Sequence, residues 1–272
     1  MNLQTTLGVD RPVALVTGSA APRVGRVIAD RLAAVGCGVA IHSHHDADAA
    51  VATAKEIRRQ HDVPTTTLTG DVTEPGIARR WVDRVVQSLG RIDILVNSAA
   101  IWFPTSLDDV TAEAVRHYFD VNTVAPMLLC RAAGRQMAVQ IRSGQSTGGS
   151  IVNLGDWATV RPYVDHAAYF PSKSAVEGMT RSMAVELAQW AAGIRVNCIQ
   201  PGPVLLADDV DADKHARLAA STLVGRIGSP DAVAHAVEFL CGNDFITGAT
   251  ITVDGGRQVY APDGLQIGLN TG

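Results

Sequence analysis

Short apolar runs alternate with amphipathic segments along most of this chain, and that alternation is what most restricts its fold. The run at 13–17 reads VALVT and stops at Gly18, and Val24, Ile28 and Leu32 then follow at helical spacing. Strands that are apolar throughout are typical of a parallel sheet covered by helices on both faces. The sequence therefore predicts an α/β fold with a doubly wound parallel sheet.

The same pattern predicts the positions of the other elements. Strands are expected at 39–41, 65–68, 92–96, 150–154, 194–199 and 249–253. Helices are expected at 24–35, 47–60, 77–89, 112–138 and 172–192, the helix at 112–138 being broken near Pro126. No change in composition marks an internal boundary, so we expect one domain over residues 1–272. Within it we expect a flexible N-terminus at 1–10, a substrate loop at about 203–225 and a C-terminal tail at 257–272.

Composition and charge narrow the classes of function. The 272 residues carry a formal net charge of −4, which supplies no basic surface for nucleic acid or anionic lipid. No window reaches the ~18 apolar residues of a membrane span, and the first residues lack a leader pattern, so we expect a cytoplasmic protein without a membrane partner. The four cysteines lie far apart and show no metal-ligand spacing, so no metal site is expected.

The first strand-to-helix turn, at residues 17–25, suits a dinucleotide phosphate. Free backbone N–H groups and the positive end of a helix attract the pyrophosphate at such a turn. Gly18 permits the tight turn, Gly25 permits close packing of helix on strand, and Arg23 adds a fixed positive charge just before Val24. A glycine-rich turn alone could be an ordinary connection. Its position after the first strand of an alternating chain favours the cofactor site.

The end of the second predicted strand bears on the choice between NAD and NADP. An acid there binds the ribose 2′-hydroxyl group and repels a 2′-phosphate. The nearest acid in this chain is Asp46, and Arg23 could reach the phosphate, so the sequence favours NADPH, with NADH possible. The alternative is that these polar residues simply form an exposed loop. The polar residues at this strand end are His42, Ser43, His44 and His45.

Tyr169 and Lys173 form a YxxxK pattern, which places the phenol and the ammonium group on one face of a helix. A phenol with a pKa of ~10 is a poor acid at neutral pH, but a neighbouring cation stabilises the phenolate and lowers that pKa. The pattern therefore predicts Tyr169 as a proton donor. YxxxK also occurs by chance, and its weight comes from its combination with the dinucleotide turn upstream.

Together with these features, further motifs make the chain resemble the short-chain dehydrogenase/reductase family from Val13 to Gly256. They are Gly70-Asp71-Val72-Thr73, Asn97-Ser98-Ala99-Ala100, Asn122, Pro201-Gly202, Ile246-Thr247-Gly248 and Asp254-Gly255-Gly256. The resemblance implies a Rossmann-type fold, a nicotinamide cofactor and a homotetramer.

Specific roles also follow from the resemblance. It implies that Asp71 and Val72 flank the adenine, that Asn97 fixes the sheet edge beside the cofactor, and that Lys173 holds the nicotinamide ribose. It further implies that Asn122 supports a proton-relay water and that the segment after Pro201 contacts the nicotinamide. The residues expected to bind the cofactor are Gly18, Arg23, Val24, Gly25, His42, Ser43, His44, His45, Asp71, Val72, Asn97, Ser98, Ala99, Lys173, Pro201 and Gly202.

Two departures from the family pattern point to a subgroup. Asp156 stands thirteen residues before Tyr169, where the family normally has serine, and Arg23 replaces the middle glycine of the turn. Both resemble the pteridine reductases and related dihydropteridine and dihydrofolate reductases, in which an aromatic residue at the position of Trp102 stacks on the pterin ring. Asp156 could otherwise be a helix cap, and Trp102 a core aromatic residue.

The leading hypothesis is an NADPH-dependent reductase that passes a hydride to the C=N bond of a pterin-like heterocycle. A carboxylate suits a protonated C=N bond better than a simple ketone. The alternatives are an NAD(P)-dependent alcohol or ketone oxidoreductase and a non-catalytic dinucleotide sensor. The expected catalytic residues are Tyr169, Lys173, Asp156 and Asn122, and the expected substrate-binding residues are Trp102, Asp156, Trp157 and Tyr169.

Overall fold

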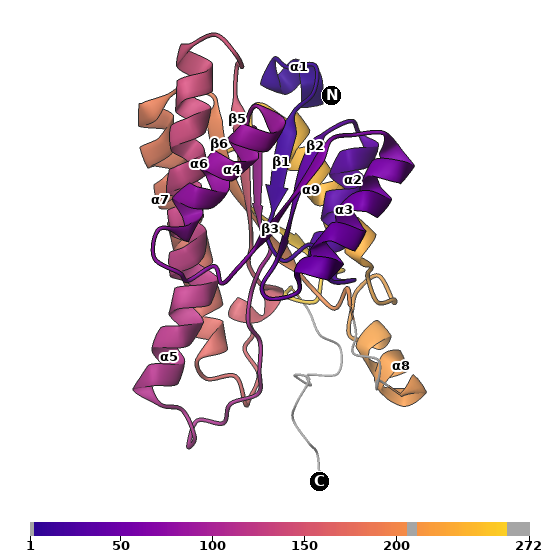
Figure 1. The fold of residues 1–272 in the computed structure, drawn as a ribbon. Helices are drawn as coiled ribbons and strands as arrows, with labels where there is room; N and C mark the ends of the chain where they lie inside the picture. The colour runs from indigo at the N-terminus through magenta and orange to yellow at the C-terminus, as the bar shows by residue number, and fades with distance from the viewer. Residues whose placement is uncertain (1–2, 206–210, 260–272) are drawn as a thin grey trace.

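A computed structural model describes residues 3–205 and 211–259 of the chain, and in it the predicted parallel sheet is confirmed. In the described residues all neighbouring strands pair in parallel, in the order β3-β2-β1-β4-β5-β6-β7 (Figure 1). The strands are β1 (Val13–Val16), β2 (Gly38–Ser43), β3 (Thr65–Thr69), β4 (Ile94–Asn97), β5 (Gly149–Leu154), β6 (Ile194–Pro201) and β7 (Thr250–Val253).

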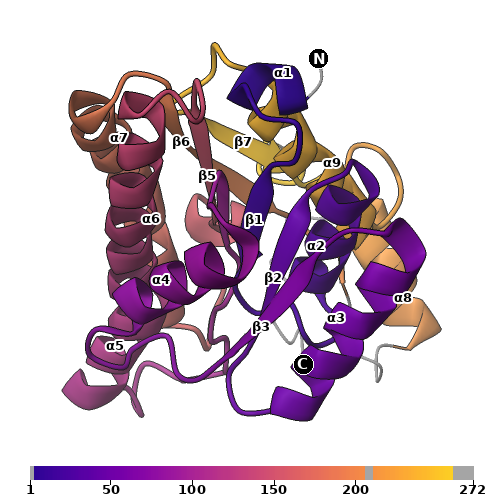
Figure 2. The same ribbon diagram turned by 45° about the horizontal axis from the view of Figure 1, so that its top comes forward.

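Helices cover both faces of this sheet (Figure 2). One face carries α1 (Leu3–Leu7), α2 (Val24–Ala34), α3 (Ala47–His61) and α9 (Pro230–Gly242). The other carries α4 (Ile77–Leu89), α6 (Ala125–Arg142) and α7 (Tyr169–Trp190). None of the helices in residues 3–205 and 211–259 has both the length and the apolar character needed to cross a membrane.

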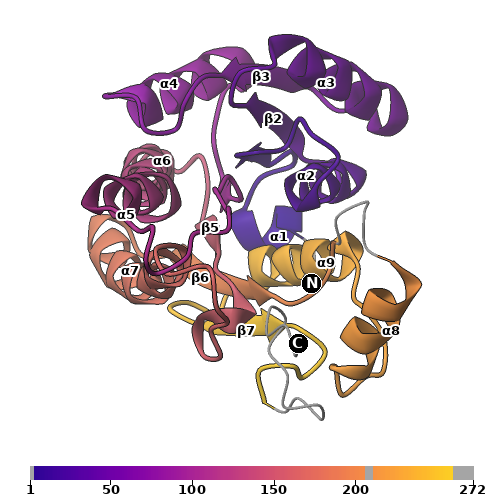
Figure 3. The ribbon, with the colours of Figure 1, turned by 90° about the horizontal axis from the view of Figure 1, so that it is seen from below.

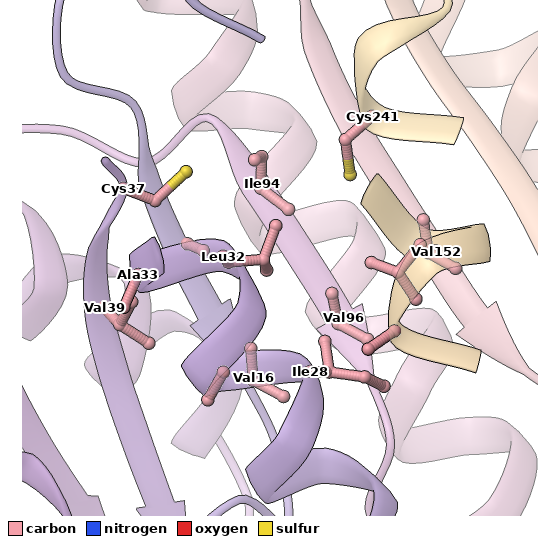
Figure 4. Packing of buried hydrophobic residues seen from close by; sticks show 14 of the residues in the cluster. Val16, Ile28, Leu32, Ala33, Cys37, Val39, Ile94, Val96, Val152 and Cys241 are labelled. Carbon is pink, nitrogen blue, oxygen red and sulfur yellow. The ribbon is translucent and has the colours of Figure 1, made fainter. Parts of the chain in front are cut away.

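The apolar runs of the sequence fold as strands because both of their faces are buried. All four residues of β1 are buried, and Val16 packs with Ile28 and Leu32 of α2 (Figure 4). Burying a side chain of this size contributes about 1.5–3 kcal/mol. The helix α2 therefore has to lie directly against β1, which brings its first turn to the end of that strand.

The break expected near Pro126 takes the form of a π-helical turn. The helix α5 (Ala112–Phe119) continues through a π-helix at Asp120–Val124 into α6, where Pro126 lies in the first turn. Proline has no backbone N–H group and cannot complete the regular hydrogen-bond ladder of an α-helix. Wider turns of this kind often occur at functional sites, and this one carries Asn122.

The first and last of the described residues include side chains that are buried against the domain. The segment expected to be a flexible N-terminus contains α1, whose Leu3 and Leu7 are buried against the domain. Residues 257–259 of the expected tail are described, and the Arg257 side chain is fully buried, which corrects its assignment to a tail. The rest of that tail, 260–272, and positions 206–210 of the expected substrate loop lie outside the described residues.

The carboxyl ends of all these strands lie at one edge of the sheet, which Figure 3 shows from below. The chain runs from β1 outward to β2 and β3 and then returns to place β4 on the other side of β1. Ligands of doubly wound sheets bind where the strand order reverses in this way. The turn after β1 and the loop after β4 therefore border the candidate site. The helix α5 and a further helix, α8 (Ala212–Ala220), extend beyond the same edge (Figure 1).

His42 joins the ends of β1, β2 and β3. Its ring Nδ1 accepts a hydrogen bond from the Gly18 N–H group at 2.9 Å, so Nε2 carries the hydrogen and donates to the Gly70 carbonyl at 3.1 Å. The ring is buried and lies 4.4 Å from the indole of Trp81. We expected His42 to hydrogen-bond the cofactor, but both of its nitrogens bind protein backbone, so its role is to hold the turn.

The burial of His42 leads to a prediction about stability and pH. Burial lowers the pKa of its imidazole from 6.5 to about 4. Between these values the unfolded chain binds more protons than the folded chain, so this contribution to stability is lost as the pH falls. Urea unfolding at pH 7 and pH 5 should show that wild type loses about 2 kcal/mol more than the His42→Leu variant. The exposed His45→Leu control should behave as wild type, and an equal pH dependence in His42→Leu would contradict the assignment.

Candidate active site

The turn after β1 is shaped to receive a dinucleotide phosphate. Gly18 has a φ of +64°, a conformation that favours glycine. A Cβ at Gly25 would lie 2.5 Å from the Gly18 carbonyl oxygen and 2.8 Å from Oγ of Ser98, so a side chain there would fill the turn. Arg23 is exposed in extended backbone at the start of α2, directly before Val24. The residues present therefore fit the phosphates of a nicotinamide dinucleotide.

Thr17 connects this turn to the loop after β4. Its Oγ1 accepts hydrogen bonds from the backbone N–H groups of Ser98 and Ala99, both at 3.0 Å. The Thr17 side chain is buried, and these contacts place Ser98 and Ala99 beside Gly18. The sequence motif included Thr17 only as part of the turn. Its function as a clamp depends on residues that are about 80 positions away, so local spacing could not reveal it.

Of the polar residues that follow His42, Ser43 and Asp46 bind the backbone at the start of α3, whereas His44 and His45 are exposed. Oγ of Ser43 accepts from the N–H group of Asp46, and the Asp46 carboxylate caps α3 by accepting from Ala49. Asp46 is thus bound to a helix terminus, where a carboxylate is favoured, rather than free to bind a ribose. His44 and His45 are exposed, and Nε2 of His44 lies 3.6 Å from a carboxylate oxygen of Asp71.

The loop after β3 carries Asp71 and Val72, both half-buried. One carboxylate oxygen of Asp71 accepts from the backbone N–H and the hydroxyl group of Thr73, each at 2.8 Å. Partial burial acts to raise the pKa of Asp71, but these hydrogen bonds outweigh it and the pKa is lowered. The loop is therefore fixed close to the exposed histidines.

Asn97 lies inside the sheet edge rather than on its surface. Its Nδ2 donates to Oδ1 of Asn153 at 2.8 Å, and Nδ2 of Asn153 donates in turn to Thr180 of α7. The side chain is buried, so it is directed toward the helices and away from a bound dinucleotide. This agrees with the implied role of Asn97 in fixing the sheet edge, and it restricts any contact with the cofactor to the backbone.

Asp156, Tyr169 and Lys173 meet at the end of β5. The Tyr169 hydroxyl group donates to Oδ2 of Asp156 at 2.7 Å, and Nζ of Lys173 donates to the Leu154 carbonyl at 2.8 Å. Tyr169 is the first residue of α7, so this helix begins before the expected residue 172 and carries both Tyr169 and Lys173 on one face. Asp156 also caps the short helix at Trp157–Thr159 by accepting from Ala158, so the cap alternative and the site role coexist.

Electrostatics at this site differ from the sequence expectation. Burial, and then the neighbouring carboxylate of Asp156, hold the pKa of Tyr169 well above its ordinary value. Lys173 was expected to lower that pKa, but its ammonium group is bonded to the Leu154 carbonyl, and burial lowers the pKa of Lys173 itself. Burial likewise raises the pKa of Asp156, although the hydrogen bond from Tyr169 opposes this. The phenol therefore keeps its proton and can act as a donor.

Asn122 organises the site through its side chain. Its Oδ1 accepts from the Ile101 N–H group at 2.9 Å, and its Nδ2 donates to the Ile101 carbonyl at 3.2 Å and to Oγ of Ser172 at 3.0 Å. Asn122 is buried in the π-helical turn and joins the loop after β4 to α7. Because these bonds occupy the amide, its side chain positions the loop and Tyr169 instead of facing the reacting atoms.

The two tryptophans expected to bind substrate have different surroundings. Trp102 is 51% exposed and stacks on the His166 ring, which rules out the core alternative for it. Trp157 is buried in an aromatic cluster with Tyr118 and Tyr169, and the Arg257 guanidinium group lies 4.8 Å from its ring centroid. Trp157 therefore packs in the wall of the site, and its role as a substrate contact stays a prediction.

The loop after β6 closes against the end of β7. Gly202 donates its N–H to Val253 at 2.9 Å, and a Cβ at Gly202 would lie 2.5 Å from the Cα of Asp254. The following Pro203 accepts a hydrogen bond from Gly228, which holds the base of the expected substrate loop together. The Pro201–Gly202 segment is thereby fixed at the same sheet edge as Asp156.

Comparison with known proteins agrees with this geometry. A family model described as enoyl-(acyl carrier protein) reductase matches residues 19–258. Pteridine reductase 1 from Leishmania tarentolae is 33% identical, over 90% of this chain and 96% of its own length. Dehydrogenase/reductase SDR family member 4 from Bos taurus is 36% identical, over 91% and 88% of the two chains. Acetoin dehydrogenase from Salmonella typhimurium superposes with a TM-score of 0.81 at 30% identity, covering 93% of this chain and 99% of that one.

The printed names of these proteins are those of reductases and dehydrogenases, and they do not agree on one substrate. The region matched by the family model, 19–258, includes most of the turn at 17–25, the loop after β4, Tyr169 and Lys173. The chain therefore belongs to the short-chain dehydrogenase/reductase family and is an NAD(P)-dependent oxidoreductase that acts on small molecules.

Proposed function

We propose that the protein is an NADPH-dependent reductase that transfers a hydride to the C=N bond of a pterin-like heterocycle. The observation that carries this proposal is the 2.7 Å hydrogen bond from Tyr169 to Asp156. A serine hydroxyl group suits a neutral carbonyl oxygen. A carboxyl group can pair with a cationic C=N bond or with the amino-pyrimidine edge of a pterin, and it can carry a proton.

The protein supplies the proton for this reduction. NADPH, when bound, supplies the hydride to the carbon of the C=N bond. The Tyr169 hydroxyl group would give its proton to the nitrogen, the protonated form of Asp156, which burial favours, would return a proton to the phenolate, and Asp156 would regain its proton from solvent. The Lys173 ammonium group, which lies near Asp156 and is bonded to the Leu154 carbonyl, would give electrostatic support to the site and would hold the nicotinamide ribose. Asn122, whose side-chain amide is occupied, would support a proton-relay water only through its backbone in the π-helical turn.

The preference for NADPH follows from the surroundings of the second strand end. Arg23 is exposed beside the phosphate turn, while Asp46 is used as the cap of α3. An arginine pairs well with a phosphate, and the Asp46 carboxylate is held at the N-terminus of α3, where the helix dipole offsets part of its charge. Ser43, His44 and His45 would complete the 2′-phosphate site with hydrogen bonds.

The remaining cofactor contacts are proposed from the positions of the loops. Asp71 and Val72 would flank the adenine, and the backbone of Ser98 and Ala99 would border the phosphates and the ribose. The segment at Pro201–Gly202 would contact the nicotinamide. Gly18, Val24 and Gly25 would hold the pyrophosphate at the start of α2, where the free N–H groups of a helix lie.

A second candidate function is the oxidation or reduction of a small alcohol or ketone. The similarity to acetoin dehydrogenase from Salmonella typhimurium favours it. In that reaction Asp156 would act only as a hydrogen-bond partner of Tyr169. The two candidates differ in whether the carboxyl group of Asp156 is required.

We also propose that the protein works as a homotetramer in the cytoplasm. Apolar side chains are exposed along the outer surface of the π-helical turn, α6 and α7, and burying them against a second copy would remove them from water. These side chains are Val124, Met127, Leu128, Val139 and Val185.

A steady-state screen of dihydropterins, dihydrofolate, cyclic imines and small ketones with NADPH tests the proposed reaction, and the Asp156→Ser variant tests its mechanism. We expect wild type to reduce a dihydropterin, and Asp156→Ser to lose at least about a hundredfold in kcat/KM because the carboxyl group that shares the proton is gone. Reduction of ketones by Asp156→Ser should be unchanged or improved.

The Asp156→Asn variant keeps the size of the side chain and should lose dihydropterin reduction as well. Wild-type rates on dihydropterin in Asp156→Ser would exclude the carboxyl mechanism.

Cofactor choice is tested with the Arg23→Ala variant. Losing a charged contact to the 2′-phosphate should raise the Kd of NADPH about tenfold, or ~1.4 kcal/mol, and leave the Kd of NADH almost unchanged. Titration of each cofactor, followed by nicotinamide fluorescence, measures both constants. Arg79 of α4 is highly exposed, and Arg79→Ala serves as the matched control. An equal loss for the two cofactors would remove Arg23 from the 2′-phosphate site.

A further inference from the structure

His166 is a buried imidazole with a fixed ring plane next to the catalytic side chains. It is 6% exposed and lies three residues before Tyr169. Its Nδ1 is 3.1 Å from the Val164 carbonyl oxygen, which can only accept, so Nδ1 carries a hydrogen. Nε2 is buried and has no hydrogen-bond partner among the described residues. Leaving such a buried polar atom unpaired costs about 1–3 kcal/mol of stability.

The backbone around His166 is held in place from the opposite loop. Thr105 and His166 form a parallel β-bridge, in which the N–H group of Thr105 donates to Asp165 at 2.6 Å. Asp165 has a φ of +63°, a left-handed conformation that is unfavourable for a residue other than glycine. The bridge ties the segment before α7 to the loop that carries Trp102, and it brings the two side chains together.

The ring of His166 lies flat under the indole of Trp102. Their centroids are 4.8 Å apart and their planes differ by 23°. Tyr163 and Phe170 contact the His166 ring at centroid distances of 5.0 and 5.9 Å and prevent it from turning. Trp102 is nevertheless 51% exposed, because the imidazole covers only one of its faces. A flat ligand can therefore stack on the remaining face of the indole.

We propose that His166 is a positioning residue for substrate specificity, whose fixed ring orients Trp102 so that the site favours flat conjugated rings over acyclic ketones. This inference rests on the proposed function, since a pterin-like substrate is such a ring. His166 acts through Trp102 and does not touch the reacting atoms. The rings of Tyr163 and Phe170 fix the rotation of the His166 ring, and the hydrogen bond between Nδ1 and Val164 adds to this packing.

The test compares variants that keep or remove a flat ring. His166→Phe keeps the ring and removes the unpaired Nε2, His166→Ala removes the ring, and His166→Leu fills the space without a flat surface. Trp102→Ala shows the full loss of stacking, and Asp165→Gly is the control, because glycine accepts a φ of +63°. Binding of pterin is measured by quenching of tryptophan fluorescence, and kcat and KM are measured for a dihydropterin and for diacetyl, an acyclic diketone.

We expect His166→Ala and His166→Leu to raise the Kd of pterin and the KM of the dihydropterin about tenfold, a typical effect of losing an ordered aromatic contact. Their kcat and their KM for diacetyl should stay close to wild type. His166→Phe should bind pterin within about threefold of wild type and should unfold at a higher temperature, because it removes a buried unpaired polar atom.

Two results would overturn the inference while leaving the proposed function in place. One is wild-type affinity for pterin in both His166→Ala and His166→Leu. The other is a loss in His166→Phe as large as in His166→Ala, which would place the role in the nitrogens and not in the flat ring. Failure of wild type both to bind pterin and to reduce the dihydropterin would instead overturn the proposed function and the inference together.

Discussion

The site depends on a constraint that every parallel sheet shares, namely that its strands end at one edge with backbone groups that no neighbouring strand can pair. Each such group near a ligand site needs another partner. Here side chains from distant segments provide it. Nδ1 of His42 binds the Gly18 N–H group, and Oγ1 of Thr17 binds the N–H groups after β4. These bonds hold three strand ends and two loops in a fixed relation, and the phosphate turn derives its shape from them.

The same edge of the sheet brings three ionisable side chains together in a buried region. Asp156, Tyr169 and Lys173 lie together. Burial raises the pKa of Asp156 and of Tyr169 and lowers the pKa of Lys173, and each shift favours the neutral form of the group. A tyrosine that keeps its proton and bonds a carboxyl group is arranged to give that proton away when a base appears at the substrate. Burial, rather than direct contact with lysine, therefore sets the resting state of the phenol.

Much of the fold could be predicted from the sequence because apolar runs and helical spacing are local patterns. Such patterns predict the buried strands, the glycine turn at residues 17–25 and the position of Tyr169 and Lys173 on one helix face. The helix α4 has the predicted bounds. The helix α1 was missed because five residues carry too little periodicity to be recognised, although Leu3 and Leu7 are buried. Part of the candidate site was equally accessible, since Asp156 was identified by its spacing to Tyr169.

The sequence by itself determined the class of fold, the dinucleotide turn and the chemical types at the reacting centre, because these depend on residues close together in the chain. Only the tertiary structure decided which of these side chains are buried and which groups of the protein they bind. In the structure His42 is bonded to protein backbone, and the Arg257 guanidinium group lies over the ring of Trp157. The pKa of Tyr169 is raised, whereas proximity to Lys173 alone predicted a decrease. The physical reason is that burial and hydrogen-bond partners come from segments far apart in the sequence, and no local pattern records them.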